Sequence, residues 1–196
     1  MKKIFFIVFL FLNQSQNIFS KEFKLQEAIN GLNSPWSLSF ISNDRVIATE
    51  KSGNLMLIDF NINEIKKIKH NLNILEDGQG GLLEVLYFKN QVFVSYSEDL
   101  KKGYSTTSVA KANFNENELN FQNIFRAEPP INSGYHFGSR LVIKDNLLYI
   151  TAGERGKGMI AQDPLKHPGS IIRVHLDGEI PKDNPKFIDK KDWLPE

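Results

Sequence analysis

Apolar and polar residues alternate in short runs along most of this chain, with the two-residue period of a β-strand. The alternation is plainest at three pairs of apolar positions that have β-branched or aromatic neighbours: Val46 and Ala48, Val92 and Val94, and Leu148 and Ile150. Successive side chains of a strand point to opposite faces of a sheet, so this period indicates half-buried strands. No helical period competes with it, and the pattern therefore predicts an all-β fold.

One strand–turn–strand unit occurs three times in the sequence. Each copy has an apolar strand, a polar turn and a second strand that leads to an acidic residue; the copies span 35–50, 81–98 and 138–154. Their turns are the pairs Asn43-Asp44, Lys89-Asn90 and Asp145-Asn146. A repeat of about 50 residues is typical of one propeller blade. Further strands are predicted at 55–60, 108–114, 121–126 and 171–176, which favours a β-propeller.

The repeats fill about three blades and the start of another. A propeller ring must close, usually with four to eight blades, and an open arc exposes a strand edge and a bare blade face. We therefore expect residues 21–196 to form a partial propeller, an incomplete domain. A compact four-bladed ring is the alternative.

The N-terminus has the pattern of an export signal. Lys2 and Lys3 precede an unbroken apolar run at 4–12, and polar residues follow at 13–17. The run is far shorter than the ~20 residues that cross a bilayer, so a signal peptide over 1–20 is favoured over a membrane anchor. A buried first strand is the remaining alternative. We expect a periplasmic or secreted protein with no stable membrane insertion.

Composition narrows the class of protein further. The chain has no cysteine, so an exported fold has to be stable without disulfides and thiol chemistry is excluded. The net charge is +1 and the lysines are scattered, so nucleic acid is not an expected partner. A hydrophobic content of 41% with 15 phenylalanines indicates a globular core.

Three glycine-bearing segments place polar residues where plain propeller strands would not. They are 77–81 (DGQGG), 134–140 (GYHFGSR) and 153–156 (GERG). Each lies at a strand boundary, and boundaries at one end of a propeller converge on the central channel. We expect the three segments to form one site.

At these motifs the chain resembles the soluble dehydrogenases of aldose sugars and glucose that depend on pyrroloquinoline quinone (PQQ), also grouped as glucose/sorbosone dehydrogenases. The resemblance covers about 32–185 and rests on motifs in one order: PWSLSF, GQGGLLEV, VSYSE, GYHFGSRLVI, AGERG, AQDPLKHPGSIIRV and DGEIPKDNP. It implies a six-bladed β-propeller, of which this chain supplies about the first three blades. It also implies oxidation of a small-molecule sugar at C1 to a lactone, with hydride transfer to PQQ and an external electron acceptor.

The same resemblance marks His136 as the general base that removes the C1 hydroxyl proton. An imidazole suits this role because its ordinary pKa leaves it largely neutral yet basic at working pH. Glu154 falls where the family places an acid that hydrogen-bonds the histidine; the glucose branch has Asp there, so Glu favours the broader aldose branch. Without the motifs, His136 would be interpreted as an exposed turn residue and Glu154 as the surface ion-pair partner of Arg155.

Three further residues are candidates for contacts with substrate or cofactor. Gln79 matches a glutamine that reaches the sugar or quinone, although a turn role is possible in its glycine cluster. Tyr135 replaces an Asp of the glucose branch, which argues against strict selectivity for glucose. Arg140 could approach a quinone carboxylate, or it could pair within the propeller.

The remaining histidines are interpreted as structural. His167 follows Asp163 by four residues, but prolines make this stretch a loop, so the two do not share a helical metal-binding face. His175 lies in a predicted strand and His70 in a lysine-rich turn. The two tryptophans are assigned to blade packing: Trp36 and Trp193.

PQQ and calcium are the cofactors that the resemblance implies, with calcium acting as a Lewis acid. In the family the calcium ligands and most quinone-binding basic residues come from later blades, and no metal ligand can be assigned in this sequence. We therefore expect a truncated chain that is inactive alone. Two other hypotheses remain: a non-catalytic extracellular propeller that binds glycan or protein, and a calcium-dependent lactonase propeller, which would need a carboxylate-rich site.

Overall fold

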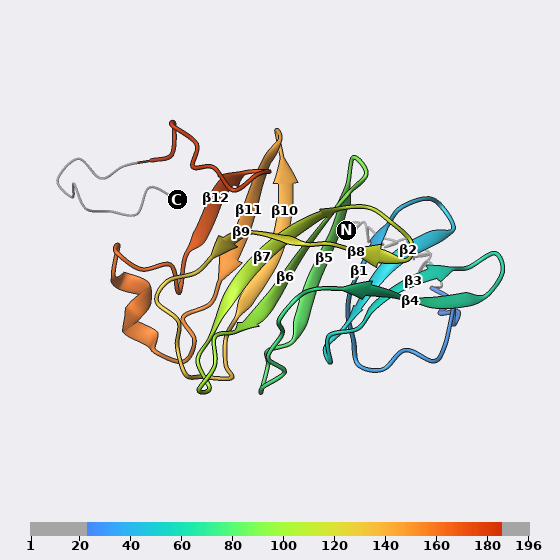
Figure 1. Cartoon of the computed structure of the whole chain (residues 1–196), viewed down its shortest axis with the longest axis horizontal. Helices are drawn as coiled ribbons and strands as arrows, with labels where there is room; N and C mark the ends of the chain where they lie inside the picture. The colour runs from blue at the N-terminus through green and yellow to red at the C-terminus, as the bar shows by residue number, and fades with distance from the viewer. Residues whose placement is uncertain (1–22, 186–196) are drawn as a thin grey trace, which may run out of the picture.

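A computed structural model describes residues 23–185 of the chain, and within them β-strands form three sheets that lie side by side (Figure 1). The predicted signal peptide and Trp193 fall outside the described residues. Sheet 1 contains β1 (Pro35–Phe40), β2 (Arg45–Glu50), β3 (Leu55–Asp59) and β4 (Glu64–His70), with the short β8 (Glu118–Leu119) parallel to β4. Sheet 2 contains β5 (Leu82–Phe88), β6 (Gln91–Asp99), β7 (Ser105–Asn113) and β9 (Gln122–Arg126). Sheet 3 contains β10 (Gly138–Lys144), β11 (Leu147–Ala152) and β12 (Ile171–His175).

Two of the predicted turns close tight hairpins. Lys89 and Asn90 join β5 to β6, and Asp145 and Asn146 join β10 to β11; all four have positive φ, between 49° and 62°. Two central residues with positive φ give a turn whose twist matches that of the flanking strands. The polar turn residues therefore fix the register that the sequence pattern predicts.

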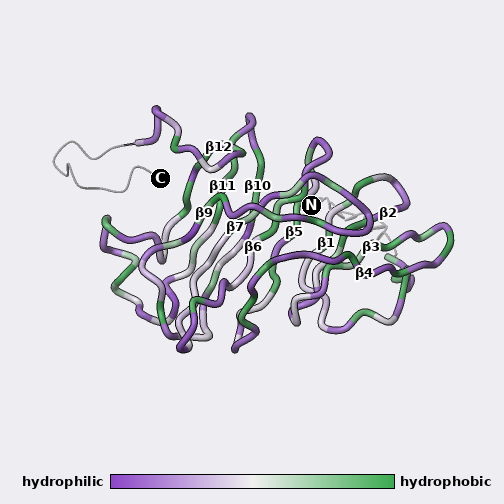
Figure 2. The backbone as a smooth tube through the Cα atoms, in the orientation of Figure 1, coloured by the Kyte–Doolittle hydropathy of each residue, from purple (hydrophilic) through white to green (hydrophobic). Residues whose placement is uncertain are grey.

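Apolar faces of neighbouring sheets pack against each other to form the core. One cluster joins sheets 1 and 2 and includes Ile47, Leu55, Val92 and Val94. A second joins sheets 2 and 3 around Phe93 and includes other strand residues such as Leu148 and Ile150. Figure 2 shows the result along the chain, with apolar stretches on the strands and hydrophilic loops between them. This alternation confirms the all-β prediction.

The three sheets do not close into a ring within residues 23–185. Large apolar side chains are consequently exposed on the outer faces of the two end sheets, among them Phe40 (59%) on sheet 1 and Val142 (58%) and Ile171 (71%) on sheet 3. The open arc of blades is the arrangement expected for part of a larger propeller, and these residues do not form the alternative compact four-bladed ring.

Each of the three sheets begins with a strand that carries an irregular register near its start. The shifts fall between Pro35 and Ser37 in β1, within 82–85 in β5 and within 138–141 in β10. A bulge leaves a main-chain N–H outside the ladder, and that group needs another acceptor. In sheet 1 the acceptor is Thr49 Oγ1, which accepts the N–H of Ser37 at 3.1 Å and donates to the carbonyl of Leu83 in sheet 2 at 2.6 Å.

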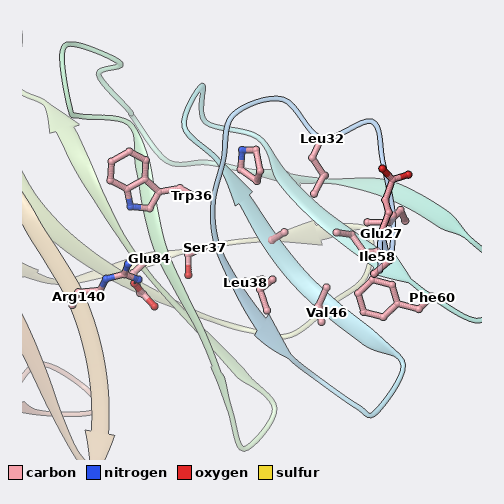
Figure 3. Close-up of a pocket in the computed structure, with 14 residues that line it drawn as sticks. Glu27, Leu32, Trp36, Ser37, Leu38, Val46, Ile58, Phe60, Glu84 and Arg140 are labelled. Atoms are coloured by element: carbon pink, nitrogen blue, oxygen red, sulfur yellow. The ribbon is translucent and has the colours of Figure 1, made fainter. Parts of the chain in front are cut away.

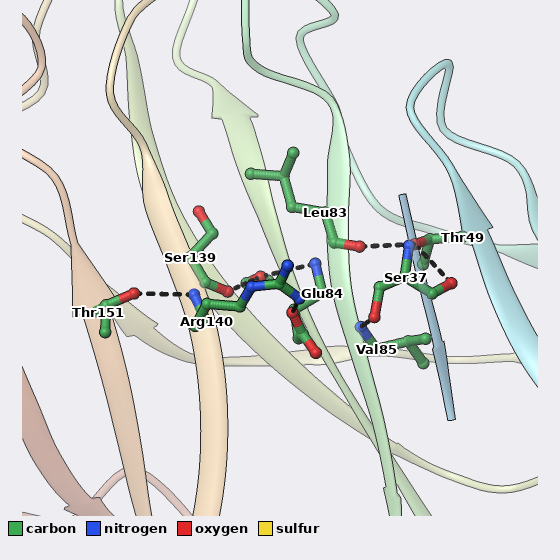
Figure 4. A network of polar contacts seen from close by, with 9 residues as sticks. Ser37, Thr49, Leu83, Glu84, Val85, Ser139, Arg140 and Thr151 are labelled. Atoms are coloured by element: carbon green, nitrogen blue, oxygen red, sulfur yellow. Dashed lines mark hydrogen bonds and ion pairs between the residues drawn. The ribbon is translucent and has the colours of Figure 1, made fainter. Parts of the chain in front are cut away.

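The same hydroxyl bridge recurs between sheets 2 and 3 (Figure 4). Ser95 Oγ accepts the N–H of Glu84 at 3.0 Å and donates to the carbonyl of Ser139 at 2.6 Å. Thr151 occupies the equivalent position in sheet 3 and accepts the N–H of Arg140 at 2.9 Å. Within the described part of the chain its hydroxyl has no acceptor, because no further sheet follows there. The bridges tie successive blades together beside the loops that carry the candidate site.

Three elements were not predicted from the sequence: β4, the short β8 and a 3-10 helix. β4 was not among the predicted strands, and His70 ends this strand instead of lying in a turn; its Nε2 donates to the carbonyl of Gly53 at 2.7 Å. The lysines of 64–70 obscured the strand because they lie on a partly exposed sheet edge. A short 3-10 helix, η1 (Gly158–Gln162), also interrupts the loop between β11 and β12. Within residues 23–185 no helix has the length and apolar character that a membrane crossing requires.

Candidate functional site

Loops from the ends of three strands bring the glycine-bearing segments together. The loop before β5 contacts the loop before β10, since Gln79 N–H donates to the carbonyl of Gly134 at 2.7 Å. In return, the side-chain oxygen of Gln79 accepts the N–H of His136 at 2.9 Å. The loop after β11 joins them through the N–H of Arg155, which donates to the carbonyl of His136 at 3.3 Å. The three motifs therefore form one connected structure.

Glycine is required where these loops touch. Gly78 has φ +55°, and a Cβ there would overlap the carbonyl oxygen of Gly134. A Cβ at Gly153 would overlap the carbonyl oxygen of His136. His136 itself has φ 49°, a left-handed conformation that is uncommon for a residue with a side chain and is concentrated at functional sites. The close main-chain contacts at Gly78 and Gly153 keep His136 in this left-handed conformation.

His136 and Glu154 form the central pair of the site. Imidazole Nδ1 is hydrogen-bonded to Glu154 Oε1, which also accepts the N–H of Gly156 at 3.1 Å. The hydrogen bond from His136 holds the pKa of the Glu154 carboxyl below its usual value. An ionised carboxylate accepts only, so Nδ1 donates the proton of this hydrogen bond, and in the neutral imidazole the lone pair lies on Nε2. Nε2 makes no hydrogen bond within residues 23–185, and the imidazole side chain is 53% exposed. The arrangement presents an oriented basic nitrogen to solvent.

Tyr135 and Gln79 flank this pair. The Tyr135 ring is exposed and meets the His136 ring edge to face, with centroids 6.2 Å apart. Gln79 is exposed as well, and because its oxygen is committed to His136, its amide NH2 is the group left for a ligand. An aromatic face and an amide donor beside a basic nitrogen suit a polyhydroxyl or planar ligand.

Arg140 shares no hydrogen bond or ion pair with those four residues. Its Nη1 pairs with Glu84 on the neighbouring β5, and the pair lies at one end of a cavity of about 610 Å³ on the outer side of β1 (Figure 3). Mostly apolar side chains line the rest of that cavity, Trp36 and Leu38 among them, together with Glu27 and Ser37. The structure thus places Arg140 in a pairing between blades, which is one of its two expected roles.

Sequence reasoning missed Arg155. The alternative interpretation of Glu154, a surface pair with Arg155, is wrong, since Arg155 is only 2% exposed and its guanidinium points to the carbonyl of Tyr135 and to Ser105. Nothing in its glycine-flanked motif indicates burial, because an arginine next to a glutamate is equally typical of a surface pair.

The histidines interpreted as structural do lie outside the site. His167 is buried, accepts the N–H of Glu128 at 2.8 Å on Nδ1, and packs edge to face on Phe125 at 5.3 Å. His175 is exposed at the end of β12. No group of three or more His, Asp or Glu side chains able to hold a metal occurs between residues 23 and 185.

Residues 23–185 are thus an arc of propeller blades whose loops hold a histidine–carboxylate pair of the kind used for proton transfer. The chain belongs to the glucose/sorbosone dehydrogenase family, whose family model matches residues 32–196. Its structural neighbours are glucose dehydrogenases and a soluble aldose sugar dehydrogenase with the propeller fold, and this chain covers about half of them.

Individual relatives agree with this assignment. The chain is 31% identical over 164 residues to aldose sugar dehydrogenase YliI of Escherichia coli, covering 79% of this chain and 44% of that protein. It is 26% identical to quinoprotein glucose dehydrogenase B of Acinetobacter calcoaceticus, covering 86% and 42%. The crystal structure of the soluble E. coli aldose sugar dehydrogenase in its apo form superposes with a TM-score of 0.81 at 29% identity, covering 87% of this chain and 52% of that one. The chain spans about half the length of the curated relatives that it matches.

Proposed function

We propose that this chain supplies the general base of a PQQ-dependent dehydrogenase that oxidises aldose sugars at C1 to lactones. The observation that carries the proposal is the His136–Glu154 pair, with Nδ1 held by the carboxylate and Nε2 open to solvent. Its membership of a family with sugar dehydrogenases supports the reaction class.

The chain's own groups suit the proton transfer in this reaction. Nε2 of His136 would accept the proton of the C1 hydroxyl, which makes the imidazole a cation. Glu154 would stabilise that cation and keep the ring oriented, as a carboxylate does behind a catalytic histidine. The hydride that leaves C1 requires an acceptor, and bound PQQ supplies that acceptor. Charge and atoms then balance: the sugar loses a proton and a hydride and becomes the lactone.

The described residues fit one side of a quinone and sugar site. Tyr135 offers an exposed ring face, and the amide of Gln79 offers a donor next to the imidazole. Arg140 would contribute positive charge toward a quinone carboxylate through the guanidinium donors that its ion pair with Glu84 leaves free. Calcium remains a family expectation, and no step is assigned to it, because residues 23–185 contain no suitable cluster of ligands.

Two features of the setting belong to the same proposal. Export to the periplasm or outside the cell by a signal peptide over 1–20 is testable by N-terminal sequencing of the mature protein. A broad aldose range follows from Tyr135 at the position of a carboxylate in the glucose branch. A panel of aldoses should therefore be oxidised at similar kcat/KM, whereas activity with glucose alone would oppose this assignment.

The decisive variant is His136→Ala in the polypeptide encoded by the complete reading frame. Dye-linked aldose oxidation with added PQQ and calcium should fall by about 10²–10⁴-fold, the usual contribution of a positioned base. His175→Ala is the matched control, since this histidine is exposed at a strand end and should leave the rate unchanged. An unchanged rate in His136→Ala would remove the imidazole from the reaction and favour a non-catalytic binding propeller.

A further inference from the structure

Arg155 is a buried cation with an unusual set of partners. Arg155 is buried, with a relative exposure of 2%. Within residues 23–185, however, no carboxylate forms an ion pair with it. Its donors instead reach main-chain oxygens and one hydroxyl. Nε donates to Tyr135 O at 2.9 Å, Nη1 to Ser105 O at 3.0 Å, and Nη2 to Ser105 Oγ at 3.0 Å and to Ser133 O.

This burial opposes stability. Removal from water lowers the pKa of the Arg155 guanidinium to about 10, although the negative charge of Asp77 acts in the opposite direction. The group therefore remains charged at neutral pH inside the protein. A buried charge without a carboxylate partner is costly, and an apolar residue of similar volume often serves stability as well or better. The position of the arginine points to a role in local geometry.

The partners of Arg155 surround His136. Ser133 and Tyr135 precede it in the same loop, and the ring of Phe137, which follows it, lies 3.6 Å from the guanidinium carbon. The main-chain N–H of Arg155 donates to the carbonyl of His136 itself. One planar guanidinium thus contacts residues before and after His136 in the loop. The fixed geometry of its five N–H donors suits it to bind several acceptors at once.

The anchor for this contact is in the neighbouring blade. Ser105 begins β7 of sheet 2 and is buried, so Arg155 attaches the His136 loop to a rigid strand. The carboxylate of Glu154, the residue before Arg155, is hydrogen-bonded to Nδ1 of His136. Two consecutive side chains therefore fix the main chain and the ring of the same histidine.

We infer that Arg155 is a positioning residue for His136: its fork, not its charge alone, holds the loop in the left-handed conformation that aims Nδ1 at Glu154. The functional meaning of this geometry rests on the proposed role of His136 as a base. The geometry itself can be measured without sugar or quinone.

Nuclear magnetic resonance of the full chain, labelled with ¹⁵N and ¹³C, tests the inference. In the wild type we expect a slowly exchanging Nδ1 proton on His136 and a Glu154 carboxyl that titrates below its usual range. In Arg155→Met and Arg155→Lys the Nδ1 proton should exchange faster by on the order of tenfold or more, and the Glu154 pKa should rise toward its usual value. Lys157→Met is the control, because Lys157 is exposed nearby and should leave both signals unchanged.

Outcomes of the two variants separate the possibilities. If a folded Arg155→Met or Arg155→Lys keeps the wild-type Nδ1 exchange and the wild-type Glu154 titration, the inference is overturned; retention in Arg155→Lys would show that charge suffices. If Arg155→Met does not fold, Arg155→Lys decides, with strand amides reporting the fold. A further outcome is that the Arg155 variants change the Nδ1 exchange and the Glu154 pKa as expected in a protein that oxidises no aldose. That result would support the positioning role of Arg155 and refute only the proposed function.

Discussion

The hydroxyl bridges between blades make a quantitative prediction about stability. Ser95 is fully buried, and its hydroxyl satisfies two main-chain groups, the N–H of Glu84 and the carbonyl of Ser139. Ser95→Ala leaves both groups without a partner in the interior. Each buried group that loses its partner costs about 1–3 kcal/mol, so the free energy of unfolding should fall by at least about 2 kcal/mol. Thr49→Val should act similarly because Thr49 makes the equivalent bridge.

Thr151→Val is the matched control for these two variants. Its hydroxyl occupies the same place in sheet 3 but serves only the N–H of Arg140, and the side chain is partly exposed, so water can replace it. We expect a loss below about 1 kcal/mol. Equilibrium unfolding in urea, followed by circular dichroism, measures all three. Equal losses in Thr151→Val and Ser95→Ala, or a loss below about 0.5 kcal/mol in Ser95→Ala, would show that the hydroxyl bridge does not stabilise the contact between blades.

Three further predictions concern the site and the pH dependence of stability. Gly153→Ala should lower kcat strongly and the melting temperature only slightly, because its Cβ would push against the main-chain oxygen of His136. A large fall in the melting temperature together with kcat would argue against a local effect. Glu154→Gln should reduce aldose oxidation by about 10²-fold or more in steady-state assays, since the imidazolium loses its counter-charge, whereas a wild-type rate would show that the carboxylate is dispensable. Burial raises the pKa of Glu98, but hydrogen bonds from Arg126 and Ser108 outweigh this and lower it. The ionised Glu98 therefore stabilises the fold fully above the pKa of the unfolded chain, about 4.3. This stabilisation is lost as pH falls through the lower pKa of Glu98 in the folded protein. Urea midpoints across pH 2–6 should show a weaker acid dependence in Glu98→Gln than in the wild type, and parallel curves would contradict this linkage.

Strand patterning made most of the fold predictable. The three repeated units became β1–β2, β5–β6 and β10–β11, because apolar alternation and polar turns both act within a few residues of the chain. β4 escaped prediction since its lysines lie on a partly exposed edge, where polarity does not oppose strand formation. Apolar alternation thus identified the strands of the repeated units and missed a strand rich in lysine.

The site was predictable in part for a different reason. Glycine marks close approaches of main chain, and the glycine-bearing segments with Gln79, His136 and Glu154 do meet. Nothing in the sequence near Arg155 indicates that it contacts Ser105 in the preceding blade, since that contact depends on how two sheets pack. Arg140 was ambiguous for the same reason, as its partner Glu84 lies on a neighbouring sheet.

Chemical rescue tests whether Nε2 of His136 accepts the proton of the sugar's C1 hydroxyl. In His136→Gly of the polypeptide from the complete reading frame, supplied with PQQ and calcium, added imidazole can take the place of the missing ring. We expect a severely slowed aldose oxidation that recovers in proportion to imidazole concentration and more strongly with more basic imidazoles. A His136→Gly rate close to wild type, or a slow rate that no imidazole restores although the variant is folded and binds PQQ, would contradict it.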